Sequence, residues 1–287
     1  MPTIQGLLTD CQQALQEISD SPLLDCQILL CHVLDKPQTY LMTWPDLVLT
    51  SQQTHQFYSL YKRRMQGEPI AYIVGEREFW SLPLKVAPST LIPRPDTETL
   101  VERVLAGEHV QDANVLDLGT GTGAIALALA SEKPNWKITA VDFNHEAVEL
   151  AKSNQQALAL GNVTVIHSDW FSSIENDVKF DLIVSNPPYI DEDDVHLSQG
   201  DVRFEPKSAL VAPNQGLADI EHIADTARNY LVDGGKVFIE HGYDQGDAVR
   251  AIFHELGYDE ARTEKDLASN DRVTWAIFND KKKTNNN

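Results

Sequence analysis

The sequence predicts an α/β protein in which a mostly parallel sheet, covered by helices on both faces, follows a small helical region. Three observations predict this class. Short strand-like runs alternate with helical patterns from about residue 96 onwards, a glycine-rich loop follows the first run, and an acidic residue ends the second. The 287 residues suffice for roughly two domains of ~150 residues each, and 42% of them are apolar, so a sizeable core can form.

Composition narrows the classes of partner and compartment. The formal net charge of −20 disfavours a stable complex with nucleic acid, because an acidic surface repels phosphates. No apolar run approaches the ~20 residues that a membrane helix needs, and no early basic region indicates a signal peptide. Cys11, Cys26 and Cys31 form no CxxC pair. This pattern is typical of a reduced, cytoplasmic protein without disulfides or a zinc site.

Residues 1–75 are expected to form a helical domain. Apolar residues recur at helical spacing on both sides of Ser21-Pro22, a pair that predicts a helix start with the serine hydroxyl as its cap. A further helix is expected over 51–66, ending at Gly67. This region contains no motif that carries chemistry, so we expect it to dock the substrate.

Residues 76–95 are expected to form a short β-hairpin and a connector. Apolar residues alternate around Ser81 and Pro83, which predicts the hairpin. Pro93 and Pro95 then fix φ at two nearby positions, so the connector should be rigid.

Residues 96–280 are expected to form the alternating α/β domain. Strands are expected over 115–118, 138–141, 163–166, 182–185, 237–240 and 273–278, with helices over 123–131, 145–160, 217–231 and 245–256. Ligands of such sheets bind beyond the carboxyl ends of the strands. The tail, 281–287, is expected to be disordered.

The first expected strand ends at the loop Gly119-Thr120-Gly121-Thr122-Gly123, and Asp142 ends the second. Glycine permits positive φ and lets a ligand approach without a Cβ in the way. An acid at the second strand end can accept hydrogen bonds from both ribose hydroxyls of a nucleoside. The pair predicts a nucleoside site. A nicotinamide cofactor remains an alternative, because Ala124 completes the relaxed GxGxxG/A pattern, and so does a tight turn without a ligand. Asp117 is expected to face the ligand's amino group or to order the loop.

Asn186-Pro187-Pro188-Tyr189 follows the fourth expected strand, at the same edge of the sheet. The prolines lock the turn and remove two donors, leaving the Asn186 side-chain oxygen and the Pro187 carbonyl as acceptors for a planar NH2 group. Tyr189 is expected to stack on that plane. The lone pair of such a nitrogen is delocalised, so positioning and electrostatics rather than a strong base would promote methyl transfer to it. A chance turn is the alternative, and a dehydrogenase is disfavoured because no hydride partner is evident.

These residues resemble the class I S-adenosylmethionine-dependent methyltransferases and, more closely, the HemK/PrmC family. The resemblance runs over nearly the whole chain and includes the stretches 67–72, 92–98, 117–123, 186–190, 205–210 and 270–272. It implies a Rossmann-like domain with a seven-stranded, mostly parallel sheet. That family methylates the side-chain amide of the glutamine in the GGQ motif of peptide chain release factors. The resemblance therefore implies a protein-glutamine N-methyltransferase whose partners are release factors.

The resemblance also implies roles for individual residues. S-adenosylmethionine would be bound by Gly119, Thr120, Gly121, Thr122, Gly123, Asp142, Phe143, Asp169, Trp170 and Asn186, with Trp170 as a core residue in the alternative. The substrate amide would be bound by Asn186, Pro187, Pro188 and Tyr189, of which Asn186, Pro187 and Tyr189 would be catalytic.

The sequence leaves the roles of several charged residues open. Arg94, Asp96 and Glu98 are expected either to shape the cleft or to cap the next helix. The acidic run 191–194 is expected to be a solvated loop rather than a metal site or an attractor of a basic substrate loop. His241 is expected to be a structural residue at a strand end, and no metal is expected.

Two rival functions use the same residues. An adenine N(6)-methyltransferase acting on DNA or RNA would hold the NH2 of a flipped base in the same turn. The net charge of −20 and the absence of a basic residue from 180–195 disfavour it. A cofactor-binding regulator would bind the cofactor without turnover, which the intact turn at Asn186 disfavours.

Overall fold

The computed structural model describes residues 1–107 and 110–280, and these form two compact units. The first unit contains Met1–Glu76 and Val195–Phe204, and the second contains Arg77–Asp194 and the described residues from Glu205 onwards. The structure therefore differs from the expected division at Val195–Phe204, which we placed inside the α/β domain. Contacts between residues far apart in the sequence place this segment in the first unit, and no local sequence pattern predicts such contacts. The expected disordered tail, 281–287, lies outside the described residues.

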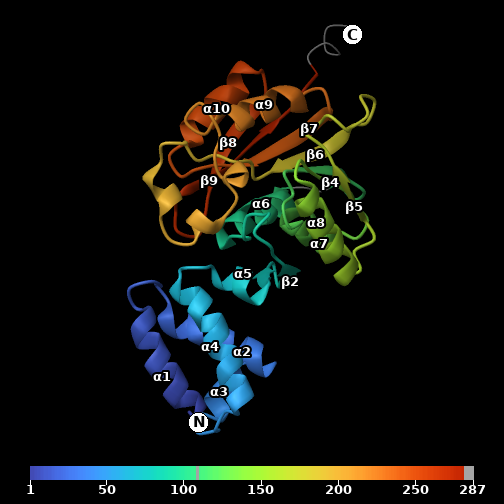
Figure 1. The fold of residues 1–287 in the computed structure, drawn as a ribbon. Coiled ribbons are helices and arrows are strands. Elements are labelled where there is room, and N and C mark those ends of the chain that lie inside the picture. Colours follow the sequence, from blue (N-terminus) through green and yellow to red (C-terminus); the bar gives the residue numbers. More distant parts are fainter. Residues whose placement is uncertain (108–109, 281–287) are drawn as a thin grey trace. The chain divides into compact units, whose positions relative to one another are not determined.

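The first unit is helical (Figure 1). Its helices are α1 (Ile4–Leu15), α2 (Pro22–Leu34), α3 (Gln38–Thr43), α4 (Ser51–Met65) and α5 (Ile70–Val74). A core that includes Leu7, Leu29 and Phe57 lies between them. The short helices α3 and α5 were not predicted, because six and five residues are too few to show a helical period.

Local sequence explains how these helices begin. The Thr50 hydroxyl accepts from the backbone N–H of Gln53, whose side chain returns a bond to the backbone of Thr50, so α4 starts with a capping box. The predicted cap at Ser21 is wrong. Its side chain makes no cap hydrogen bond, because ψ of 56° places Ser21 outside the extended conformation that capping needs.

A buried arginine joins α4 to the segment Val195–Phe204 inside the first unit. Nε of Arg64 donates to Oδ2 of Asp25 at 2.7 Å, and its Nη1 donates to Oδ1 of Asp201 at 2.9 Å. The Arg64 side chain is only 7% exposed, so two carboxylates compensate its charge where water cannot.

The second unit starts with a hairpin, as predicted. Its strands are β1 (Glu76–Phe79) and β2 (Leu82–Lys85). The turn between them places Trp80 and Ser81 at φ of 52° and 59°. Positive φ at both central residues matches the twist of a two-residue hairpin.

A seven-stranded sheet in the order β5-β4-β3-β6-β7-β9-β8 forms the centre of this unit, which confirms the predicted fold class. Its strands are β3 (Asn114–Leu118), β4 (Lys137–Asp142), β5 (Val163–His167), β6 (Phe180–Ser185), β7 (Leu231–Glu240), β8 (Asp259–Lys265) and β9 (Asp271–Ile277). Strands β3 to β7 pair in parallel, whereas β9 is antiparallel to both β7 and β8. The strand order reverses at β3, between β4 and β6, which is where open α/β sheets bind ligands.

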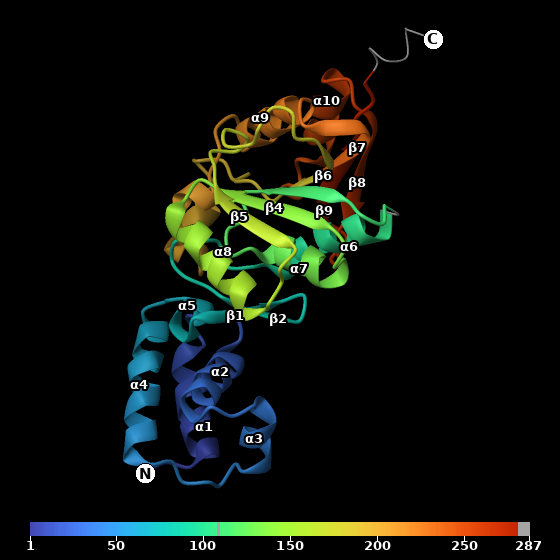
Figure 2. The same cartoon turned by 90° about the vertical axis from the view of Figure 1, so that its right-hand side faces the viewer.

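Helices cover both faces of the sheet (Figures 1 and 2). One face carries α6 (Glu98–Gly107), α7 (Ala124–Glu132) and α8 (His145–Ala157), and the other carries α9 (Ala218–Ala227) and α10 (Gly246–Glu255). The helix predicted over 217–231 ends at Ala227, because Leu231 already begins β7. Among the described residues, no helix combines the length and the apolar character that a membrane span requires.

Candidate active site

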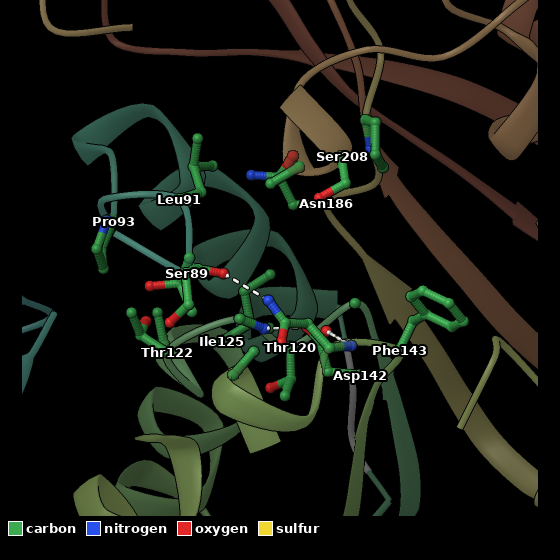
Figure 3. Close-up of a pocket in the computed structure, with 18 of the residues that line it drawn as sticks. Ser89, Leu91, Pro93, Thr120, Thr122, Ile125, Asp142, Phe143, Asn186 and Ser208 are labelled. Carbon is green, nitrogen blue, oxygen red and sulfur yellow. Dashed lines mark hydrogen bonds between the residues drawn. The ribbon is translucent and has the colours of Figure 1, made fainter. Parts of the chain in front are cut away.

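A cavity of about 370 Å³ opens at the carboxyl ends of the parallel strands. Residues at or after the ends of β3, β4, β5 and β6 line it, together with the connector before α6 and two residues of the short helix η4 (Lys207–Ala209). Its volume suits a small-molecule ligand. Figure 3 shows Asn186 and Ser208 together on one side, with Thr120, Thr122 and Asp142 on the other.

The glycine loop forms the part of the cavity after β3. The backbone N–H of Thr120 donates to the Val141 carbonyl at 2.9 Å, which holds the loop against the end of β4. Gly119 and Gly121 line the cavity at φ of 70° and 56°, a conformation that favours glycine. Gly123 does not line it. Gly123 instead precedes α7 at φ of 86°, and a Cβ there would lie 3.0 Å from Leu127 Cδ1.

Asp117 lies beneath this loop and not at the cavity. It is completely buried, and its Oδ2 accepts a hydrogen bond of 2.6 Å from the Thr120 hydroxyl. Burial raises the pKa of Asp117 to about 7, although the bond from Thr120 opposes the shift. Of the two interpretations, ordering the loop fits this position, and facing a ligand does not.

Asp142 presents a fixed carboxyl group to the cavity. Its Oδ2 accepts from the backbone N–H of Gly121 and its Oδ1 from that of Asn144, both at 2.8 Å. Burial raises the pKa of Asp142, and these two N–H groups and the nearby His167 oppose that shift. A carboxylate held in this way keeps further lone pairs for two hydroxyl groups.

The three other residues predicted to bind the cofactor's nucleoside part all line the cavity. These are Phe143, Asp169 and Trp170. Phe143 is 69% exposed, so its ring is available to a ligand. Trp170 has φ of 45°, and its carbonyl accepts from the Ser168 hydroxyl at 2.7 Å. Because Trp170 also packs against the core, both interpretations of it apply.

The turn after β6 contributes Asn186 and Pro188 to the cavity, whereas Pro187 and Tyr189 do not line it. Nδ2 of Asn186 donates to the Thr97 hydroxyl oxygen at 3.1 Å, which leaves the side-chain oxygen unengaged by that bond. The Tyr189 hydroxyl donates to Oε1 of Glu240 at 3.3 Å. Its ring packs against the core, so the structure does not place it over a substrate plane.

The three charged residues of the connector have separate positions. Arg94 lines the cavity and forms an ion pair with the buried Glu205 carboxylate. Oδ2 of Asp96 lies 3.4 Å from Nη2 of Arg272. Oε1 of Glu98 accepts a hydrogen bond from the Trp80 backbone N–H at 2.9 Å. Arg94 is therefore the one of these three that reaches the cavity.

The acidic run and His241 occupy structural positions. The Asp193 N–H donates to Oδ1 of Asp191 at 2.9 Å, which closes a turn. Residues 1–107 and 110–280 contain no group of three acidic, histidine or cysteine side chains that could hold a metal. His241 is buried at the end of β7, with Nε2 at 2.7 Å from the Thr274 hydroxyl oxygen, and burial lowers its pKa.

Sequence reasoning missed several cavity residues: Ser89, Thr90, Leu91, Thr97, Ile125, Ala147, Ser208, Ala209 and Asp219. They come from the connector and from helical segments, and no role was predicted for them from the sequence. The stretch 205–210 could have indicated two of them, Ser208 and Ala209. Glu205 in this stretch pairs with Arg94, and Ser208 lies at the cavity.

Comparisons with known proteins now identify the family. The model of the PrmC N-terminal domain matches residues 6–75, and that of the Methyltransferase small domain matches residues 95–204. The Release factor glutamine methyltransferase of Vibrio cholerae is 57% identical over 96% of this chain and 97% of its own. The protein of the same name from Escherichia coli is 54% identical over 91% and 94%. A crystal structure of a methyltransferase from Pyrococcus furiosus shares the fold, with a TM-score of 0.54 at 18% identity over 79% of this chain and 99% of that one. The chain belongs to the family of release factor glutamine methyltransferases.

Proposed function

We propose that this chain transfers a methyl group from S-adenosylmethionine to the side-chain amide nitrogen of the glutamine in the GGQ motif of peptide chain release factors. One observation carries the proposal. Asn186 stands at the cavity with its Nδ2 bonded to Thr97, so that its carbonyl oxygen is left for a substrate NH2 group. The names and the nearly full-length similarity of the relatives support the same activity.

The residues around the cavity fit S-adenosylmethionine. The exposed backbone of the loop from Gly119 to Thr122 would hold its methionine part, and Asp142 would accept hydrogen bonds from its ribose hydroxyls. Phe143 and Trp170 offer apolar faces to adenine. When bound, this cofactor supplies a methyl group on a positively charged sulfur.

Asn186 would position and polarise the substrate nitrogen. Its side-chain oxygen accepts a hydrogen bond from the glutamine NH2, which draws charge onto a nitrogen whose lone pair is delocalised. No strong base would be needed before attack, because the N–H proton becomes acidic only as the new C–N bond forms and would then pass to water. Pro188, at the cavity, limits how far the turn can move. The stacking role predicted for Tyr189 would require its ring to leave the core, so the Asn186 oxygen is the better supported of the two contacts.

The helical domain, 1–75, would dock the release factor. It contains no residue of the cavity, and a model of the PrmC N-terminal domain matches it. We further propose that the protein acts in the cytoplasm, where translation ends. Its charge of −20 argues against stable nucleic-acid binding.

Mass spectrometry of a purified bacterial release factor, incubated with this protein and S-adenosylmethionine, tests the proposal. We expect one added methyl group on the GGQ glutamine and none on a factor whose glutamine is replaced by alanine. Duplex DNA serves as a parallel substrate. Methylation of DNA adenine with an unmodified release factor would contradict the proposal and favour the nucleic-acid enzyme.

A further inference from the structure

A buried asparagine on α8 connects two parts of the cavity wall. Asn154 is 1% exposed, and its side-chain amide bonds to the backbone of Lys85, at the end of β2, and of Thr122, in the glycine loop. Thr122 lines the cavity, and the part of the connector that lines it begins four residues after Lys85, at Ser89. Neither the sequence motifs nor the proposed function gives Asn154 a role.

Three hydrogen bonds engage this amide at both of its ends. Its Oδ1 accepts from the Lys85 backbone N–H at 2.8 Å. Its Nδ2 donates to the Lys85 carbonyl at 3.0 Å and to the Thr122 carbonyl at 2.9 Å, which uses both protons of the NH2 group. The opposite orientation of the amide would place its NH2 against an N–H and its oxygen against two carbonyls. The backbone partners therefore fix the orientation of the amide, and the amide holds the two partners together.

On one side, Asn154 anchors the hairpin. It bonds to both the N–H and the carbonyl of Lys85, as a residue of a neighbouring antiparallel strand would. Lys85 Nζ adds a bond of 3.0 Å to the hydroxyl of Ser153, also on α8. Nδ2 of Asn144, the cap of α8, donates to the Ser89 carbonyl at 3.1 Å, and Figure 3 draws this bond. One helix thus holds the hairpin and the start of the connector.

On the other side, Asn154 fixes the glycine loop. The peptide group between Thr122 and Gly123 is engaged at both ends, since its carbonyl accepts from Asn154 and its N–H donates to the Thr120 carbonyl at 2.8 Å. Asn154 itself does not line the cavity, so it acts on a ligand only through the loop. We propose that Asn154 is a positioning residue for S-adenosylmethionine, which sets the backbone of Thr122 where the methionine part of the cofactor is received.

The inference rests on the placement of the methionine part given under the proposed function, and two ligands that differ at this part test it. S-adenosylhomocysteine carries the amino-acid group, whereas 5′-methylthioadenosine keeps the adenine and the ribose but lacks that group. A residue that acts through Thr122 should affect the first ligand and spare the second. A residue that only stabilises the fold should affect both alike.

Two substitutions in the full-length protein remove the bond to Thr122. Asn154→Asp keeps an acceptor for the Lys85 N–H but loses both donor bonds, and Asn154→Leu removes all three bonds at similar volume. We expect each to raise the dissociation constant of S-adenosylhomocysteine about tenfold, by calorimetry, as the loss of roughly one hydrogen bond would. The dissociation constant of 5′-methylthioadenosine should stay unchanged.

Asn162→Leu is the matched control. Nδ2 of this half-buried asparagine also donates to two backbone carbonyls, those of Ala130 and Lys133, and none of the three residues lines the cavity. Both dissociation constants should be unchanged in this control. Equal weakening of both ligands in an Asn154 variant that still unfolds cooperatively would overturn the inference. An unchanged dissociation constant of S-adenosylhomocysteine in both Asn154 variants would overturn it too.

Hydrogen–deuterium exchange tests the same bonds without any ligand. The backbone N–H groups of 119–123 and of Lys85 should exchange faster in Asn154→Leu than in the unsubstituted protein, and at the original rate in Asn162→Leu. Unchanged exchange over 119–123 in Asn154→Leu would overturn the inference. Failure of the unsubstituted protein to methylate release factors would instead contradict the proposed function, and the binding and exchange results would still decide the role of Asn154.

Discussion

At the scale of single residues, the proposed chemistry divides between two polar side chains at opposite sides of one cavity. Asn186 carries an acceptor for the reacting nitrogen, and Asp142 carries acceptors for a nucleoside (Figure 3). Both are oriented by neighbours rather than by solvent: Thr97 holds the first, and the N–H groups of Gly121 and Asn144 hold the second. Substitution of Asn186 should therefore lower turnover, whereas substitution of Asp142 should weaken cofactor binding.

Asn186→Ala should reduce single-turnover methyl transfer by about 10² to 10³, because it removes the acceptor that acts on the reacting nitrogen. Cofactor affinity, measured by calorimetry, should be retained. Asn229→Ala, at an exposed asparagine remote in sequence from the turn, is the control. Near-normal single-turnover rates in Asn186→Ala would remove Asn186 from the mechanism.

Asp142→Ala should weaken S-adenosylmethionine binding by roughly 10- to 100-fold, which corresponds to the loss of hydrogen bonds to one charged group. Asp142→Asn keeps an acceptor for the Gly121 N–H and should have an intermediate effect. Calorimetry measures both, with the exposed Asp177→Ala as control. An unchanged dissociation constant in Asp142→Ala would contradict the ribose assignment.

At the scale of elements, the turn at 186–189 is held by contacts from two later segments of the chain. Gly216 has φ of 80°, and a Cβ there would lie 2.0 Å from the Tyr189 carbonyl oxygen. That same carbonyl accepts from Nε2 of Gln245, just before α10, at 3.0 Å. The backbone after β6 is thus fixed by close approach of another segment and not by its prolines alone.

Gly216→Ala should lower both the melting temperature and the turnover. Gly234 is its matched control, because it has φ of 81° with nothing within 4 Å of an added Cβ. Gly234→Ala should cost only the backbone strain, about 1–2 kcal/mol in the free energy of unfolding, whereas Gly216→Ala adds the displacement of Tyr189. Equal losses of stability in the two variants, measured by thermal unfolding, would show that the close contact is unimportant.

The elements also show what the sequence can predict. The strands β3, β4 and β6 and the loop at Gly119 have local signatures, namely short buried apolar runs and glycines at fixed spacing. Strand β8 was missed, because an edge strand rich in charged residues has no apolar alternation to detect. A motif likewise does not reveal which way each member faces. Gly123 and Tyr189 were expected to contact ligands but do not line the cavity, while Thr97 and Ser208 line it although no role was predicted for them.

At the scale of the whole molecule, the helical unit is completed by a segment from much later in the chain. Val195–Phe204 belongs to this unit, and Arg64 pairs with both Asp25 and Asp201. On either side of the segment, the chain returns to the α/β unit, where Asn186 and the Arg94–Glu205 pair lie. The helical unit is therefore connected through the chain itself to the turn proposed to bind the substrate.

Arg64→Ala should destabilise the first unit by about 3–5 kcal/mol, because it leaves Asp25 buried without its cation. Arg63→Ala, at the neighbouring ion pair with Glu68, is the matched control and should cost at most about 1 kcal/mol, since the Arg63 side chain is 41% exposed. Urea unfolding of the full chain measures the free energies. Limited trypsin digestion should also cleave after Arg203 faster in Arg64→Ala, and equal cleavage rates would contradict the role of Arg64 in holding this segment.

The late segment also sets an order of events during synthesis. The ribosome releases α1 to α5 first, but the unit that they form lacks Val195–Phe204 until strands β3 to β6 have been made. Deleting residues 1–75 would accordingly do more than remove a docking domain. It would leave Val195–Phe204 without its binding partners, a few residues after the turn that we propose holds the reacting amide.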